Sequence, residues 1–103
     1  MAHVKVQLKV DATGRVFTDP APVIVNPGDT IEWQCDAGDV RVSFKGQGLL
    51  DGVQEFDGKR GKATAHAKVK GDVARGKHFD CIITLNGKPM GKVYGVDTSG
   101  SGD

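Results

Sequence analysis

The sequence predicts an all-β protein, an antiparallel Greek-key β-sandwich of seven or eight short strands. Apolar and polar residues alternate with a period of two along most of the chain, as in strands with one buried face. Turn signals rich in Gly, Asp, Asn and Pro recur about every ten residues, which is the strand spacing of a sandwich. No stretch keeps a helical period for more than one turn.

The composition is that of an ordinary soluble globular domain. The chain has 103 residues, of which 38% are hydrophobic and 26% are charged. This length buries enough apolar surface for a core without metals or disulfides. The 15 glycines stand mostly between apolar runs, where they predict turns. We expect one sandwich domain over residues 1–96 and a flexible, Ser/Gly-rich C-terminal tail over residues 97–103.

The charge and hydropathy of the chain argue against nucleic acid and membranes as partners. The formal net charge of +1 argues against a nucleic-acid-binding module. The basic cluster at residues 59–62 is interpreted as a solvated loop. No segment approaches the ~18 apolar residues of a membrane span, and the first residues alternate without the apolar core of a signal peptide. We therefore expect no membrane association and a cytoplasmic location.

In the first half of the chain, alternation predicts strands over residues 4–10, 23–25, 30–35 and 40–45. The turn at residues 26–29 is the most specific signal between them, because Pro27 has a fixed φ and Gly28 can adopt a positive φ. Three residues of the following strand share one face, which we expect to be buried: Ile31, Trp33 and Cys35.

The second half begins with an irregular stretch, residues 46–58. Four apolar residues in it are expected to fill the core: Leu49, Leu50, Val53 and Phe56. Alternation returns over residues 63–69, 79–85 and 91–96. The small side chains of Ala63, Ala65 and Ala67 favour close packing against Trp33. The Asn86-Gly87 pair is the strongest hairpin signal in the chain.

Three motifs in order resemble the cupredoxin, or blue-copper, pattern. They are Pro-Gly-Asp-Thr-Ile-Glu-Trp at residues 27–33, Phe-Asp-Cys at 79–81 and Pro-Met-Gly-Lys-Val at 89–93. In that family a Gly-Asp-Thr turn opens a core strand, a ligand Cys ends a late strand, and a Met before a glycine precedes the last strand. The resemblance spans about residues 20–96 and implies a cupredoxin-like sandwich. An immunoglobulin-like sandwich is the alternative, because it shares the strand pattern.

The copper ligands of that family are incomplete here. A blue-copper site takes two imidazoles, a thiolate and a weak axial Met. Cys81 and Met90 stand at the family's Cys and Met positions, but Val40 stands at about the first His position. Residues 82–89 contain no histidine for the second. We therefore expect no metal and no other cofactor.

A degenerate ligand set and catalysis are the remaining alternatives for this region. His78, Cys81 and Met90 form a trio of soft ligands, with His66 as a fourth candidate, and would suit a small redox or metal-carrier protein. The carboxylates fall mostly in turns, and no serine–histidine motif, phosphate-binding loop or metal-ligand spacing accompanies them. We expect no catalytic residues and no enzyme activity.

The two cysteines bear on the compartment. Cys35 and Cys81 each follow an aromatic residue by two positions, so alternation points both sulfurs inward. Without an export signal we expect two buried, reduced thiols. The alternative is a disulfide between them, which would indicate a periplasmic or secreted protein.

The function that these patterns favour is a non-catalytic, copper-free cupredoxin-like module for protein binding or assembly. Its partner would be an unknown protein, and the module itself a monomer or a weak homo-oligomer. Residues 46–58 and 70–77 are the expected contact segments, because loops on a rigid scaffold carry most binding residues.

Overall fold

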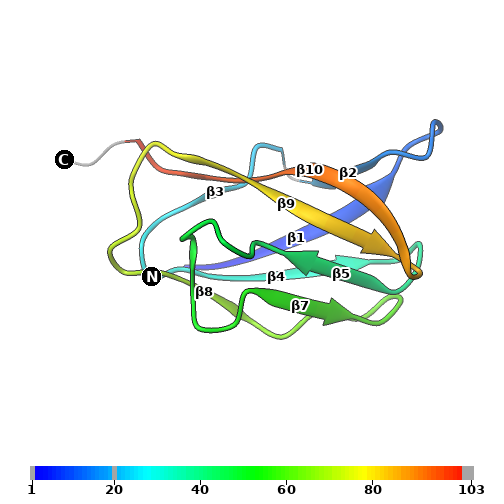
Figure 1. Cartoon of the computed structure of the whole chain (residues 1–103), viewed down its shortest axis with the longest axis horizontal. Helices are drawn as coiled ribbons and strands as arrows, with labels where there is room; N and C mark the ends of the chain where they lie inside the picture. Colours follow the sequence, from blue (N-terminus) through cyan, green and yellow to red (C-terminus); the bar gives the residue numbers. More distant parts are fainter. Residues whose placement is uncertain (1, 20, 101–103) are drawn as a thin grey trace.

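The computed structural model describes residues 2–19 and 21–100 and contains two curled β-sheets of five strands each. Sheet A has the strand order β2-β1-β4-β8-β6, and sheet B has the order β3-β10-β9-β5-β7. Figure 1 shows that β1 begins and β10 ends at the same end of the molecule, opposite the β9–β10 turn. Among the described residues, no helix has the length and apolarity that crossing a membrane requires.

The strand bounds in chain order are β1 (His3–Val10), β2 (Val16–Asp19), β3 (Ile24–Val25), β4 (Thr30–Cys35), β5 (Val40–Ser43), β6 (Leu50–Asp51), β7 (Glu55–Gly58), β8 (Ala67–Val69), β9 (His78–Leu85) and β10 (Lys88–Thr98). The all-β prediction is confirmed. The strand count differs, because β2, β6 and β7 form where the sequence shows only short or irregular patterns. Each has four residues or fewer, too few for alternation to stand out.

Both sheets are mixed, which corrects the prediction of a purely antiparallel sandwich. β1 pairs in parallel with β4, and β10 pairs in parallel with β3, whereas the remaining ladders are antiparallel. Turn signals in the sequence report only how neighbouring strands connect. They carry no information on pairs such as β1 and β4, which are separated by two other strands.

A buried carboxylate anchors the start of β1. Asp29 is 3% exposed. Its Oδ1 accepts from the Ala2 amide at 2.8 Å, and its Oδ2 accepts from the Asn26 amide at 2.9 Å. The Thr30 amide donates to the Ala2 carbonyl at 3.0 Å. The turn predicted at residues 26–29 is present, with Gly28 at a φ of 84°, and it holds β1 in register beside β4.

The core between the sheets is centred on Trp33, which is fully buried. Its ring lies 5.6 Å from the Phe44 ring and 5.9 Å from the Phe56 ring, measured between centroids. The prediction that Trp33 packs against Ala63 and Ala65 is wrong, because both alanines are exposed. Thr64 is buried in their place: its amide donates to the Trp33 carbonyl at 2.8 Å, and its Oγ1 accepts from the Trp33 amide at 3.2 Å.

A one-residue irregularity in sheet A explains that error. β4 and β8 pair Ile31 with Ala67, whereas a separate bridge pairs Gln34 with Ala63. The two pairings do not belong to one continuous ladder, and a slip of one residue moves side chains to the opposite face. Alternation counted back from Ala67 therefore assigns the wrong face.

Two further expectations need correction. Val53, expected in the core, is 62% exposed in the turn between β6 and β7. The domain boundary expected at residue 96 falls too early, because β10 continues to Thr98. Thr98 is buried, and its Oγ1 donates to the Ala74 carbonyl at 2.7 Å. Residues 101–103 of the expected tail lie outside the described residues.

We expect Trp33→Ala to lower the free energy of unfolding by about 3–5 kcal/mol, because it leaves a large cavity between the sheets. Chemical denaturation measures this change. The exposed substitution Val53→Ala is the control and should stay within about 0.5 kcal/mol of the wild type. Folded wild-type protein should show blue-shifted Trp33 fluorescence, and an emission maximum typical of exposed indole would contradict the assignment.

Candidate functional site

The trio considered from the sequence is not assembled. His78 and Cys81 lie three residues apart on β9, so they point to opposite faces: His78 is exposed, and Cys81 is fully buried. Met90 lies at the turn end of the β9–β10 hairpin, beside Thr84 and Ile83, whereas His78 pairs with Asp97 at the other end. The five residue steps along β9 from His78 to Ile83 span roughly 17 Å, so His78 and Met90 are too far apart to share a metal ion.

The other positions of the blue-copper pattern and of the soft-ligand set also lie apart from Cys81. Val40, at the family's first His position, is buried in β5 of sheet B. His66, the fourth candidate, lies just before β8 in sheet A. The degenerate redox or metal-carrier site is therefore not formed by the folded chain.

Both cysteines are buried free thiols, on different sheets. The inward orientation predicted by alternation is confirmed, since Cys35 is 1% and Cys81 0% exposed. The Cys81 Sγ donates weakly to the Val93 carbonyl at 3.7 Å. Burial raises the pKa of the Cys81 thiol to about 12. At neutral pH this sulfur is a protonated thiol and a poor nucleophile or metal ligand.

A polar network lies on the outer face of sheet B, and a β-bulge in β10 creates it. The β9–β10 register shifts between Val93 and Val96. Gly95 occupies the bulge, where a Cβ atom would lie 2.3 Å from the Phe79 carbonyl oxygen. The extra residue resets the alternation, so that Tyr94 and Asp97 share the outer face although they are three residues apart.

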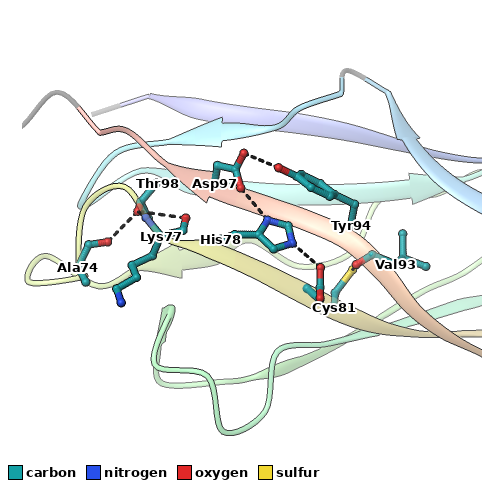
Figure 2. A network of polar contacts seen from close by, with 9 residues as sticks. Ala74, Lys77, His78, Cys81, Val93, Tyr94, Asp97 and Thr98 are labelled. Atoms are coloured by element: carbon teal, nitrogen blue, oxygen red, sulfur yellow. Dashed lines mark hydrogen bonds and ion pairs between the residues drawn. The ribbon is translucent and has the colours of Figure 1, made fainter.

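His78 is the centre of this network (Figure 2). Its Nδ1 lies 2.7 Å from Asp97 Oδ1, and its Nε2 lies 2.5 Å from Asp80 Oδ1. The Tyr94 hydroxyl donates to Asp97 Oδ2 at 2.7 Å, and the Tyr94 ring lies 4.0 Å from the imidazole. Both imidazole nitrogens are engaged, so the ring keeps no free nitrogen for a substrate.

The electrostatics of the network follow from these contacts. The hydrogen bond to Asp97, and then that to Asp80, raises the pKa of His78. The hydrogen bonds from Tyr94 and His78 lower the pKa of Asp97, and the bond to Asp97 raises the pKa of Tyr94. The network is therefore a set of exposed hydrogen bonds that orients the Tyr94 ring, and it becomes an ion pair when His78 is protonated.

An apolar groove lies beside Tyr94, with a volume of about 440 Å³. Residues 16–18 of β2 form one wall, Val93 and Tyr94 of β10 form the other, and Ala21 and Pro22 contribute to the lining. Two large side chains at this groove are unusually accessible, Phe17 at 43% and Tyr94 at 50%. Exposed aromatic residues that gather at a concave surface are typical of an interaction site.

The groove coincides with an open side of both sheets. Within residues 2–19 and 21–100, β2 is an edge strand that pairs with β1 alone. β10 pairs with β3 only at Asp97 and Thr98, so among the described strands none pairs with its earlier residues on the side away from β9. Backbone hydrogen-bonding groups on such edges can accept a further strand.

The two segments expected to make contacts, residues 46–58 and 70–77, combine exposed residues with a few that are buried in the core. Residues 46–58 contain β6 and β7, and Leu49, Leu50 and Phe56 are buried as predicted. Residues 70–77 bury Val73. In the basic loop at residues 59–62, the Arg60 amide donates to Asp39 Oδ1 at 2.9 Å, so part of this loop is tied to the neighbouring turn.

A second polar cluster lies on the outer face of sheet A and was missed from the sequence. His3, Glu32 and His66 bring one ligand atom each to within 4.8 Å of one another. They come from β1, from β4 and from the residue before β8. The three positions are far apart in the sequence, and only the strand order of sheet A brings them together.

We expect both thiols to be unreactive in the folded protein and two to react after denaturation without reductant. Burial and the raised pKa of Cys81 give the reason. Thiol titration measures this, and the absence of reactive thiols in denaturant would indicate a disulfide.

Addition of Cu²⁺ should produce no intense thiolate-to-copper absorption in the visible range, because Cys81 has no imidazole beside it.

We expect NMR titration to place the pKa of His78 above its ordinary value of 6.5, and Asp97→Asn to bring it down. A raised pKa in the folded state means that His78 contributes stability below the unfolded pKa, and that this contribution is lost as the pH rises through the folded pKa. The difference in unfolding free energy between wild type and His78→Gln should therefore shrink over that range. Asp51→Asn on the distant strand β6 is the control and should leave the titration unchanged.

No protein-family model matches this chain. A search of curated proteins likewise finds no match. The groove, the two polar clusters and the buried thiols therefore carry the functional inference, through their own geometry and chemistry.

Proposed function

We propose that this chain is a non-catalytic, copper-free cupredoxin-like module that binds an extended segment of a partner protein. The observation that carries the proposal is the apolar groove between β2 and β10, with Phe17 and Tyr94 accessible on its walls. The ligand is an extended polypeptide with apolar side chains that enter this groove. The cupredoxin-like assignment rests on the three sequence motifs and on a two-sheet architecture that is compatible with it.

The open strand edges support an extended ligand. A peptide that adds to the edge of a sheet gains backbone hydrogen bonds, and its alternate side chains give specificity. β2 presents such an edge beside the groove, and residues 91–96 of β10 present another. A ligand strand could therefore pair with one edge while its apolar side chains pack against Phe17 and Tyr94.

The network around His78 supports the same surface. The Tyr94 hydroxyl is held by Asp97, and the ring packs against the imidazole at an interplanar angle of 41°. An aromatic side chain that is already ordered loses less conformational entropy on binding than a free one. The network thereby prepares Tyr94 as a rigid contact, which suits a binding surface better than a catalytic one.

A random-peptide display library, selected against the purified protein, provides the probe for this surface. We expect enriched peptides to carry apolar side chains and to shift the amide resonances of residues 16–18 and 92–95. Phe17→Asp should abolish binding, because it places a charge in the apolar groove. Val53→Asp is the matched control, because Val53 is also an exposed apolar residue but lies away from the groove, between β6 and β7.

Three outcomes would contradict the proposal. The first is a selection without enrichment. The second is a set of peptides whose shifts map to residues 46–58 or 70–77. The third is binding that Phe17→Asp leaves intact.

A further inference from the structure

We propose that His3, Glu32 and His66 form a surface site for a divalent transition-metal ion, for which zinc is the best match. The site goes beyond the proposed binding groove and uses different residues. Both imidazoles turn the same ring atom toward one carboxylate oxygen: His3 Nε2 lies 2.5 Å and His66 Nε2 3.5 Å from Glu32 Oε1. The two imidazole centroids are 4.2 Å apart.

Strand register places the three side chains together. The parallel β1–β4 ladder pairs His3 with Thr30 and Lys5 with Glu32, so these alternate residues share the outer face of sheet A. On the other side of β4, the β8 ladder pairs Ile31 with Ala67. One residue further along, this antiparallel ladder brings His66 beside Glu32.

The spacing of the donor atoms suits a metal ion. A tetrahedral zinc ion with bonds of about 2.0–2.1 Å holds its ligand atoms roughly 3.3 Å apart. The distance from His66 to Glu32 already matches that value, and the His3 contact must open by about 1 Å. All three side chains have some solvent access, with 31%, 16% and 62% of the side-chain surface exposed for His3, Glu32 and His66. Two imidazoles and one carboxylate form a known zinc ligand set that leaves a fourth position open.

The neighbours of the cluster prepare it for this role. The Thr30 hydroxyl lies 2.7 Å from His3 Nδ1 and fixes the orientation of the ring. When an ion replaces the proton that His3 Nε2 shares with Glu32, Nδ1–H donates to that hydroxyl and the Nε2 lone pair is directed at the ion, as in zinc sites with a second hydrogen-bonded shell. The hydrogen bond from His3 lowers the pKa of Glu32, which is therefore an anion at neutral pH.

One neighbouring charge opposes the ion. Lys5 lies opposite Glu32 in the ladder, and its charge acts on the carboxylate. The positive charge of Lys5, beside Glu32, repels a metal cation and weakens its binding. The site should therefore be weaker than a buried zinc site and should fill on addition of metal. It is also separate from the Cys81 set, for which we expect no metal.

The third histidine provides a contrast within the same chain. His78 also contacts two carboxylates, but Asp97 lies at its Nδ1 and Asp80 at its Nε2. These two nitrogens point away from each other, so one ion cannot contact both carboxylates together with the imidazole. In the part of the chain that the structure describes, His3, Glu32 and His66 are the one group with converging His, Cys, Asp or Glu ligand atoms.

Titration of metal-free protein with Zn²⁺, followed by calorimetry and by histidine NMR resonances, tests the site. We expect one Zn²⁺ per chain, with shifts at His3 and His66, and a rise in Tm on addition of Zn²⁺. His3→Ala and His66→Ala should each weaken binding more than Thr30→Val, for which a loss of about tenfold is expected. Lys5→Gln should strengthen it.

Two controls keep the result specific. His78→Ala removes the remaining histidine and should leave the affinity for Zn²⁺ unchanged. Phe17→Asp, which is designed to block the groove, should also leave it unchanged, so failure of the peptide site and failure of the metal site are distinguishable. Buried Trp33 fluorescence confirms that each variant is folded.

The proposal is overturned if wild-type protein shows neither heat nor His3 and His66 shifts with Zn²⁺. Binding that survives in the His3→Ala/His66→Ala double variant, or that is lost in His78→Ala, would also overturn it. The effect of His66→Ala is the decisive measurement. His66 meets His3 only in the folded sheet, so loss of Zn²⁺ binding in this variant excludes a site made by the first residues alone.

Discussion

The parallel pairing of β1 with β4, held by the buried Asp29 carboxylate, is the constraint on which much of this molecule depends. A buried carboxylate is costly unless its oxygens are hydrogen-bonded. Asp29 meets that condition by accepting from the amides of Ala2 and Asn26, which ties the start of β1 to the turn before β4. The register that follows buries Val6 and Leu8 against the opposite sheet and turns His3 outward toward Glu32.

A single bulge has a comparable effect on sheet B. If β10 ran through Gly95 as a regular strand, without the bulge, Tyr94 and Asp97 would point to opposite faces and could not both contact His78. Any larger side chain at Gly95 would collide with the Phe79 carbonyl and with the Phe44 ring. The bulge therefore links the packing of the core to the exposed tyrosine of the groove, because the same glycine serves both.

The two outer faces offer different chemistry. Sheet A presents two imidazoles that converge on one carboxylate oxygen, an arrangement that a divalent cation would satisfy. Sheet B presents one imidazole whose two nitrogens are already occupied, and this arrangement orders a neighbouring aromatic ring. We propose metal binding for the first arrangement and protein binding beside the second, and the difference lies in which ring atoms face the carboxylates.

The sequence by itself determined the all-β class, the turns at residues 26–29 and 86–87, and the burial of Trp33, Cys35 and Cys81, because alternation and turn chemistry are local. Tertiary structure decided the strand partners, the slip that buries Thr64 in place of Ala63 and Ala65, and the bulge at Gly95. It also decided both polar clusters, since His3, Glu32 and His66 belong to strands whose adjacency no local pattern encodes. Pairing between distant strands depends on how the whole core packs, and only the folded chain contains that information.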